Sequence, residues 1–391
     1  MRRLHVITPG VVHQQARQAL SRSLDWKPFH ESVSVDHLLD LLLLMAASTA
    51  SLFATVRRFF AFSHQTASLA VKANLPERQN IHWLTRGLVT ALYDVAAFSR
   101  KDRHRNWMVA IDTHLVPYYG TPTPDVVGGP KKQGTKWFYC YATAVLLHKR
   151  RRYTIALEPV FAKTQPHEIV RVLLDQIAEK GLEIRGVTLD SGFDSGETLL
   201  LLQERNLAYS VPMRRKGSGR NARNRCFEGR HGQVRWVEWT TKKSRLPVRT
   251  RTYLWQGSRK TLLFAFQGWS GDRARTVHDK ALQSRRLYRR RFGIETSYRQ
   301  KNQAQARTTS RDPIYRLLLE GIAYLLRQVW VMLTEILARQ SHAAPNAWIG
   351  ALPLQQLVDW LVHELTELHR ETEEITGKTA GIQTNISGKY W

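Results

Sequence analysis

The chain has 391 residues, and 43% of them are apolar, which excludes a mostly disordered protein. At about 150 residues per domain its length suggests two or three domains, and its two cysteines, Cys140 and Cys226, exclude a fold held together by a disulfide framework. The 59 lysines and arginines outnumber the 32 acidic residues, and the formal net charge of +27 favours a polyanionic partner, most often a nucleic acid.

The excess of positive charge is concentrated in one quarter of the chain. Residues 214–311 contain 27 lysines and arginines but only five acidic residues, whereas residues 1–100 contain 11 basic and six acidic residues. A generally basic surface would spread the charge more evenly. The uneven distribution therefore favours a nucleic acid as the partner.

Residues 1–105 are predicted to form a helical N-terminal domain. Apolar residues recur at steps of three and four from Leu38 to Phe60, and Ser34 is placed to cap the first helix. The most hydrophobic stretch, residues 41–56, is shorter than the roughly 20 apolar residues that span a bilayer, so we expect a buried core helix. No apolar run follows the first arginines, so we expect no signal peptide and a cytoplasmic protein. This domain has either a DNA-binding role or the role of a cap packed on the next domain.

Residues 106–213 are predicted to form an α/β domain with a mixed sheet. Short apolar or β-branched runs indicate five strands, and two amphipathic runs indicate helices between the later strands. The strands are expected at residues 108–112, 138–147, 153–160, 184–190 and 208–213, and the helices at residues 168–180 and 197–204.

The remaining chain divides into three predicted regions. Residues 214–272, rich in Arg, Gly and Trp, are expected to be a small β insertion, and residues 273–340 are expected to complete the core with helices at 276–303 and 312–339. Residues 341–391 are expected to contain a linker and a last helix at 354–374. Leu361, Leu365 and Leu368 lie on one face of that helix and suggest dimerisation.

Two strands of the α/β domain are predicted to end in carboxylates. Asp112 follows the first strand and Asp190 follows the fourth, and sites in open α/β sheets form beyond strand ends. Two adjacent carboxylates repel each other unless a cation lies between them. Mg²⁺ takes such oxygen ligands, and two metal ions together support phosphoryl transfer. Glu295, a lone acid among arginines, is the candidate for a third ligand.

A predicted helix places Glu295 among functional side chains. Tyr288, Arg291, Glu295 and Arg299 are spaced by three or four residues and so share one helix face. Flanking arginines would keep the glutamate ionised. The alternative is an ordinary surface ion pair, which contributes a few tenths of a kcal/mol.

These motifs together resemble the DDE transposases of prokaryotic insertion sequences, which have a ribonuclease-H-like core and, in one group, a β insertion. The segments that carry the resemblance are residues 111–114 (IDTH), 189–193 (LDSGF) and 288–295 (YRRRFGIE). The family's lysine normally follows the glutamate by seven residues, but position 302 is Asn and Lys301 comes one residue early. Either Lys301 or Arg299 is then the candidate for that role.

The resemblance implies cut-and-paste DNA transposition in the prokaryotic nucleoid. Asp112, Asp190 and Glu295 would be the catalytic acids and would hold two Mg²⁺ ions, with Mn²⁺ able to substitute. The partners would be double-stranded DNA, as terminal inverted repeats and target DNA, and a second copy of the chain in a homodimer. Arg291 would contact a phosphate or orient Glu295, and Tyr288 would contact DNA near the cut.

The same resemblance suggests further DNA contacts in the β insertion. Relatives can form a DNA hairpin and flip a base onto a tryptophan of the insertion, although a tryptophan can equally fill a small β core. The candidate tryptophans are Trp236, Trp239, Trp255 and Trp269. Arg214, Arg215 and Lys216 are candidates for phosphate contacts.

Several alternatives stay open at this level. Asp194 could replace Asp190 as a ligand, and His114 could approach a metal, although a hydrogen-bonded loop histidine is the more ordinary interpretation. A metal-dependent, structure-selective nuclease on the same fold would carry the same acids. A non-catalytic DNA-binding protein derived from a transposase is the third possibility, and the presence of all three acids weighs against it.

Overall fold

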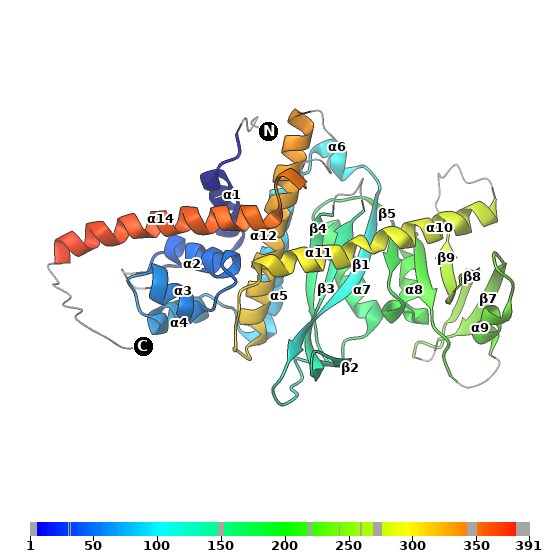
Figure 1. The fold of residues 1–391 in the computed structure, drawn as a ribbon. Helices are drawn as coiled ribbons and strands as arrows, with labels where there is room; N and C mark the ends of the chain where they lie inside the picture. The colour runs from blue at the N-terminus through cyan, green and yellow to red at the C-terminus, as the bar shows by residue number, and fades with distance from the viewer. Residues whose placement is uncertain are drawn as a thin grey trace. The chain divides into compact units, whose positions relative to one another are not determined.

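The computed structural model of the protein describes residues 6–29, 31, 33–147, 152–217, 221–241, 243–258, 260–268, 276–341 and 350–380, the last ten of these by backbone only. The chain forms two compact units (Figure 1). One unit contains residues 88–300, and the other combines residues 1–87 with residues 301–391. The predicted region 273–340 is therefore divided between the two units.

A nine-stranded mixed sheet is the centre of the unit formed by residues 88–300. Its strands follow the order β2-β3-β1-β5-β6-β9-β8-β7, with β4 paired to β3. β1 pairs in parallel with β5, and β5 with β6, whereas the other pairs are antiparallel. The strands are β1 (Trp107–Tyr118), β2 (Val127–Lys132), β3 (Thr135–Leu146), β4 (Thr154–Val160), β5 (Ile184–Leu189), β6 (Ala208–Met213), β7 (Val234–Thr240), β8 (Pro247–Gln256) and β9 (Thr261–Gln267).

This arrangement confirms the predicted ribonuclease-H-like α/β class and changes two expectations. β1 does not end at Asp112, as predicted, but continues to Tyr118, because the residues after Asp112 keep pairing with β3. The inserted strands extend the core sheet, since β9 pairs directly with β6. The sequence did not predict the strands β2 and β8. For β2 the reason is its exposed, glycine-containing sequence, which lacks an apolar pattern.

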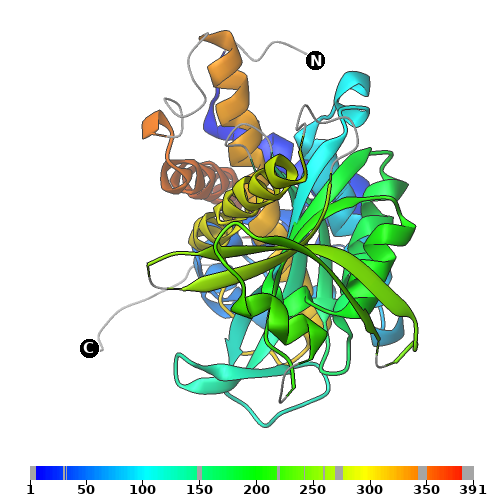
Figure 2. The same ribbon diagram turned by 90° about the vertical axis from the view of Figure 1, so that its right-hand side faces the viewer.

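Helices cover both faces of this sheet. On one face α7 (Pro166–Glu179) contacts β3 and β4, and α8 (Gly196–Glu204) contacts β6 and β8. On the other face α10 (Val277–Arg291) crosses β5, β6 and β9, and α11 (Gly293–Lys301) follows it (Figures 1 and 2). The greater part of α5 (Ile81–Ala96) and the short helices α6 (Arg100–Arg103) and α9 (Ala222–Arg225) also belong to this unit.

The second unit is helical. It contains α1 (Pro9–Ser23), α2 (Val35–Ala47), α3 (Leu52–Phe59), α4 (His64–Ala73), the start of α5 (Ile81–Ala96), α12 (Pro313–Gln340) and α14 (Leu354–Ala380). Ser34 caps α2 as predicted. The hydrophobic stretch 41–56 is not one helix, because α2 and α3 meet at an angle of 115°.

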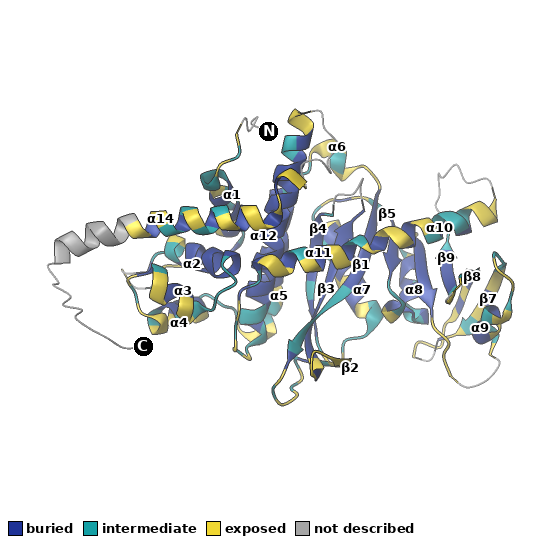
Figure 3. Cartoon of the chain, in the orientation of Figure 1, coloured by how far each residue is buried: buried dark blue, intermediate teal, exposed yellow. Residues whose placement is uncertain are grey.

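α12 is the core helix of this second unit. Among the described helices, α12 is the one single helix that is long and apolar enough to cross a membrane. The apolar stretch that meets this test is completely buried inside the structure (Figure 3). The prediction that the last helix uses its leucines for dimerisation is wrong for two of the three. Leu361 and Leu365 of α14 are fully buried, and α14 packs on α1, α2 and α12 of the same chain, whereas Leu368 is 40% exposed.

Candidate active site

The register of two parallel strands brings Asp112 and Asp190 together. β1 and β5 pair in parallel up to Ile111 and Leu189, so the two aspartates are the next residues on neighbouring strands. Adjacent strands lie about 4.8 Å apart. The backbone alone therefore places the two aspartates side by side, where β5 ends and β1 continues.

The Arg291 guanidinium lies between these two aspartates. Arg291 is the last residue of α10 and is 4% exposed. Its Nη1 donates a hydrogen bond to Oδ2 of Asp112, and its Nη2 lies 3.4 Å from Oδ1 of Asp190. The backbone N–H of Thr113 donates to Oδ1 of Asp112 over 2.9 Å. One buried cation thus contacts both carboxylates.

The site keeps an excess of negative charge despite Arg291. Burial is the largest cause of a raised pKa at Asp112, which reaches about 6. Arg291 opposes this increase, and the charges of Asp190 and Glu295 add to it. A single guanidinium therefore does not compensate the three acids, and a further cation would stabilise their ionised forms.

Glu295 approaches the aspartates from the first turn of α11. Its side chain is exposed, and its charge acts on Asp112. The four residues predicted to share one helix face lie on two helices, because α10 ends at Arg291 and α11 begins at Gly293. A Cβ at Gly293 would lie 2.6 Å from Nε of Arg152, so glycine allows this side chain to approach the junction closely. The glutamate is therefore presented to solvent, while Arg291 is directed into the core.

The residues fit a hard divalent cation in their chemistry. Asp112 and Asp190 offer adjacent carboxylate oxygens, and Asp112 carries the electrostatic penalty that a metal ion would remove. Within the described ranges, no group of three or more His, Cys, Asp or Glu side chains lies close enough to enclose a metal ion. The two aspartates thus offer a pair of carboxylates of the kind that a divalent cation takes, and the charge of the exposed Glu295 also acts on Asp112.

Tyr288 has a different place from the predicted one. It is buried in an aromatic cluster of the inserted strands, where its ring meets Phe264 edge-on at 5.2 Å. The Arg291 guanidinium lies 5.2 Å from the centre of the Tyr288 ring. Tyr288 therefore supports Arg291 from inside the protein, and the prediction that it contacts DNA does not agree with its burial.

Tyr298 is a residue of this site that the sequence did not reveal. Its hydroxyl bonds to Oγ1 of Thr143 over 2.9 Å, and its ring lies 4.8 Å from that of His114. Burial raises the pKa of Tyr298 well above its usual value. These contacts fix α11 on β1 and β3. The only sequence signal is its position three residues after Glu295, which is one helical turn.

Lys301 does not take the predicted place of a DNA contact. Its side chain is fully buried, and its ammonium lies 2.8 and 2.9 Å from the two carboxylate oxygens of Glu320 on α12. Gln305 accepts a third hydrogen bond over 2.7 Å. A phosphate cannot reach this ammonium without breaking a buried ion pair. Arg299, by contrast, is exposed.

Asp194 anchors the basic segment that follows β6. It is 3% exposed, contacts Arg223, and accepts a hydrogen bond over 2.7 Å from the backbone N–H of Arg214. Asp194 therefore forms a buried structural ion pair. This arrangement argues against the alternative that Asp194 replaces Asp190 as a metal ligand. The side chains of Arg214, Arg215 and Lys216 remain exposed. Nε of Arg214 donates to Ser191, which directly follows Asp190, over 3.0 Å.

Among the candidate tryptophans, Trp236 is the most exposed of those in the described ranges. It is 54% exposed, and the guanidinium groups of Arg249 and Arg251 lie 4.7 and 4.8 Å from its ring centre. Trp239 is half-buried beside Arg223, and Trp255 packs against the aromatic cluster. Trp269 lies outside the described residues.

Comparisons with known proteins found a matching family model and solved structures with a similar fold. A family model described as the transposase DDE domain matches residues 103–313, which is just over half of the chain. A solved structure with a similar fold is the cryo-EM structure of a piggyBac transposase synaptic complex with hairpin DNA. The TM-score is 0.60 at 11% sequence identity, over 99% of this chain and 87% of the other. No curated protein matches the sequence.

Proposed function

Because the chain belongs to the family of transposases with a DDE domain, we propose that it is the transposase of an insertion sequence. It binds terminal inverted repeats and catalyses metal-dependent strand cleavage followed by transfer of the 3′-OH end. The observation that carries this proposal is the pairing of Asp112 and Asp190 at the end of β5, beneath the helix that presents Glu295. The net charge of +27 supports DNA as the substrate.

The proposed catalytic acids have different tasks. Asp112 and Asp190 would hold Mg²⁺, and Glu295 would contribute a ligand from the solvent side. When bound, the metal would supply activation of the attacking oxygen and stabilisation of the leaving oxygen. Arg291 holds the two aspartates in position and neutralises part of their charge.

The proposed DNA surface combines charge and stacking. Residues 214–216 are exposed directly after β6 and are linked to the turn that follows Asp190. Trp236 with its two arginines offers an aromatic face and two cations on the inserted strands. Arginine and aromatic side chains together bind unpaired bases with little sequence preference. A homodimer would hold two DNA ends at once.

A cleavage and joining assay tests this function against its alternatives. Purified protein is incubated with Mg²⁺, a DNA fragment ending in the element's inverted repeat, and a circular target. Joined products are the result expected of a transposase. Cleavage without joining would indicate a nuclease, and binding without cleavage would indicate a non-catalytic protein. Sedimentation of the protein–DNA complex measures how many protein copies bind each pair of DNA ends. Two copies are expected of a homodimer, and one copy would contradict it.

A further inference from the structure

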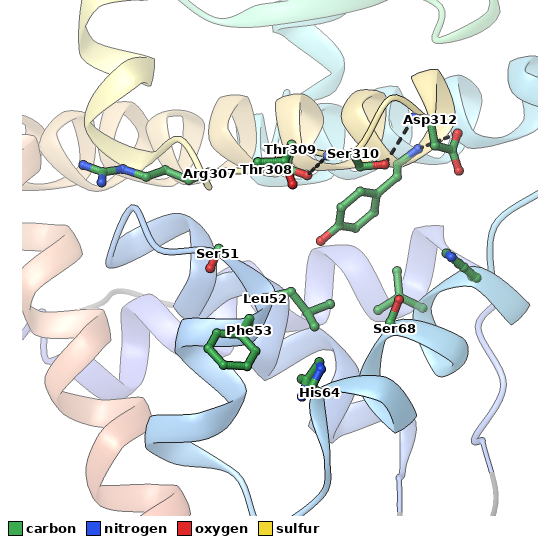
Figure 4. A pocket seen from close by; sticks show the side chains of 13 residues that line it. Ser51, Leu52, Phe53, His64, Ser68, Arg307, Thr308, Thr309, Ser310 and Asp312 are labelled. Atoms are coloured by element: carbon green, nitrogen blue, oxygen red, sulfur yellow. Dashed lines mark hydrogen bonds between the residues drawn. The ribbon is translucent and has the colours of Figure 1, made fainter. Parts of the chain in front are cut away.

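A cavity of about 510 Å³ lies within the helical unit (Figure 4). One wall is formed by α3 and α4, and the other by residues 307–310 and the start of α12. All of its lining residues belong to the same compact unit. The volume falls within the range of roughly 300–1,000 Å³ that is typical of small-molecule sites.

The walls of this cavity carry more positive than negative charge. Lys72 and Arg307 line it, and Asp312 is its one acidic residue. Asp312 caps α12, accepting a hydrogen bond over 2.8 Å from the N–H of Ile314. Among the described side chains, no ion pair joins Lys72 or Arg307 to an acid. The cavity therefore attracts an anion.

An aromatic and apolar surface lies beside these cations. Phe53 is 50% exposed, and its ring meets that of His64 edge-on at 4.9 Å. Leu52 and Tyr315 also line the cavity. A phosphate ion alone would make no use of this apolar surface, and an apolar ligand would make no use of the cations. A nucleotide has both a flat base and a charged phosphate.

The polar wall opposite α3 is held in a fixed shape. Nε of Arg316 donates to the carbonyl of Ser310 over 2.6 Å, and its Nη2 donates to the carbonyl of Thr308 over 3.2 Å. The N–H of Arg307 bonds to the carbonyl of Ala50 over 3.0 Å, which joins this wall to the start of α3. The cavity is therefore preformed, and a ligand would bind without ordering a loop.

We propose that this cavity binds one nucleotide unit, with its base against Phe53 and its phosphate bound by the basic side chains that line the cavity, Lys72 and Arg307. The proposal rests on the proposed function for the source of the nucleotide, which is an unpaired nucleotide of the DNA substrate. A base in a duplex would first have to leave its stack, at a cost of a few kcal/mol. The site therefore favours single-stranded or mismatched DNA over perfect duplex.

The test uses the full chain and two probes, deoxyadenosine monophosphate and a duplex carrying one unpaired 2-aminopurine. In the wild-type protein we expect ligand NMR to show contacts from the base of the mononucleotide, and 2-aminopurine fluorescence to fall on binding. The double variant Lys72→Gln/Arg307→Gln should weaken both by about tenfold or more, because charge-assisted contacts to phosphate are lost. Arg57→Gln, an exposed change on α3 outside the cavity, is the control and should change neither.

The outcomes separate the possible ligands. Binding of the unpaired base but not of the mononucleotide assigns the site to DNA, and equal binding of both assigns it to nucleotides in general. If inorganic phosphate competes as well as the mononucleotide, or if the double variant and Phe53→Leu bind both probes like the wild type, the proposal is overturned. Asp112→Asn separates it from the proposed function, since that variant should lose cleavage and keep nucleotide binding. A wild-type protein that binds the mononucleotide but fails to cleave DNA would reject the transposase proposal and leave the cavity site standing.

Discussion

Asp112→Asn is expected to make the protein more stable at neutral pH while removing its activity. Asp112 is 8% exposed, and its pKa is raised mainly by burial from 3.8 to about 6. Folding therefore favours the protonated carboxyl, and the native state loses stability when the group ionises. Asparagine resembles the protonated form, and its amide oxygen still accepts a hydrogen bond from Arg291. Asp190 remains as a counter-ion for Arg291.

The size of this gain follows from the shift of the pKa. A change from 3.8 to about 6 corresponds to about 3 kcal/mol at pH values above 6. Since the pKa is raised in the folded state, the stabilising contribution of this group is fully present below about pH 4 and is lost as the pH rises through about 6. The difference between variant and wild type should therefore be about half as large at pH 5 as at pH 7.5. For a unit of this size, about 3 kcal/mol raises Tm by roughly 6–12 °C.

Urea denaturation of both proteins in EDTA, at pH 5 and pH 7.5, measures the effect. Asp175→Asn is the matched control, because Asp175 forms an exposed ion pair with Arg205 and should change stability by less than about 1 kcal/mol. Added Mg²⁺ should stabilise the wild type more than the Asn variant, since only the wild type keeps both aspartates. An Asn variant no more stable than the wild type at pH 7.5, or a gain independent of pH, would refute the reasoning.

Three further changes test other parts of the structure. Replacing residues 214–216 with alanine should weaken DNA binding and reduce its salt dependence by roughly 0.9 per lost phosphate contact, measured by fluorescence anisotropy; an unaltered slope would show that these exposed side chains do not contact DNA. Gly196→Ala should cost about 1–3 kcal/mol in urea denaturation, because its Cβ would lie 2.7 Å from Thr241, and an unchanged midpoint would contradict that packing. Lys301→Met should cost about 3–5 kcal/mol, because Glu320 would stay buried without its partner, and adding Glu320→Leu should recover much of the loss; equal stabilities of all three proteins would show that the pair is not buried.

The sequence predicted the elements that have strong local signals. The strand before Asp190 and the helix after it lie close to their predicted ranges, residues 184–190 and 197–204. The end of β1 could not be predicted in this way, because the strand continues past Asp112 only through its pairing with β3. The break between α10 and α11 could not be predicted either, because Phe292 and Gly293 do not strongly interrupt the apolar pattern of the single helix expected at residues 276–303.

Side-chain environments at the site were less predictable than its location. Tyr288 and Arg291 occupy expected positions along the helix, yet both are buried, because the inserted strands bring Phe264 against Tyr288. Lys301 is one residue from the position where the family has its lysine, and a pairing partner 19 residues later decides its orientation. Contacts of this kind depend on tertiary packing, which no pattern within one helix reports.

The central claim is that Asp112, Asp190 and Glu295 act together in metal-dependent DNA cleavage. The most direct measurement compares cleavage of inverted-repeat DNA in Mg²⁺ by the wild type and by Asp112→Asn, Asp190→Asn and Glu295→Gln, with DNA affinity measured on the same samples. Each variant should cleave at least about a hundredfold more slowly while binding DNA as tightly as the wild type. Any one of the three cleaving at the wild-type rate would contradict the assignment of that acid, and all three doing so would reject the account.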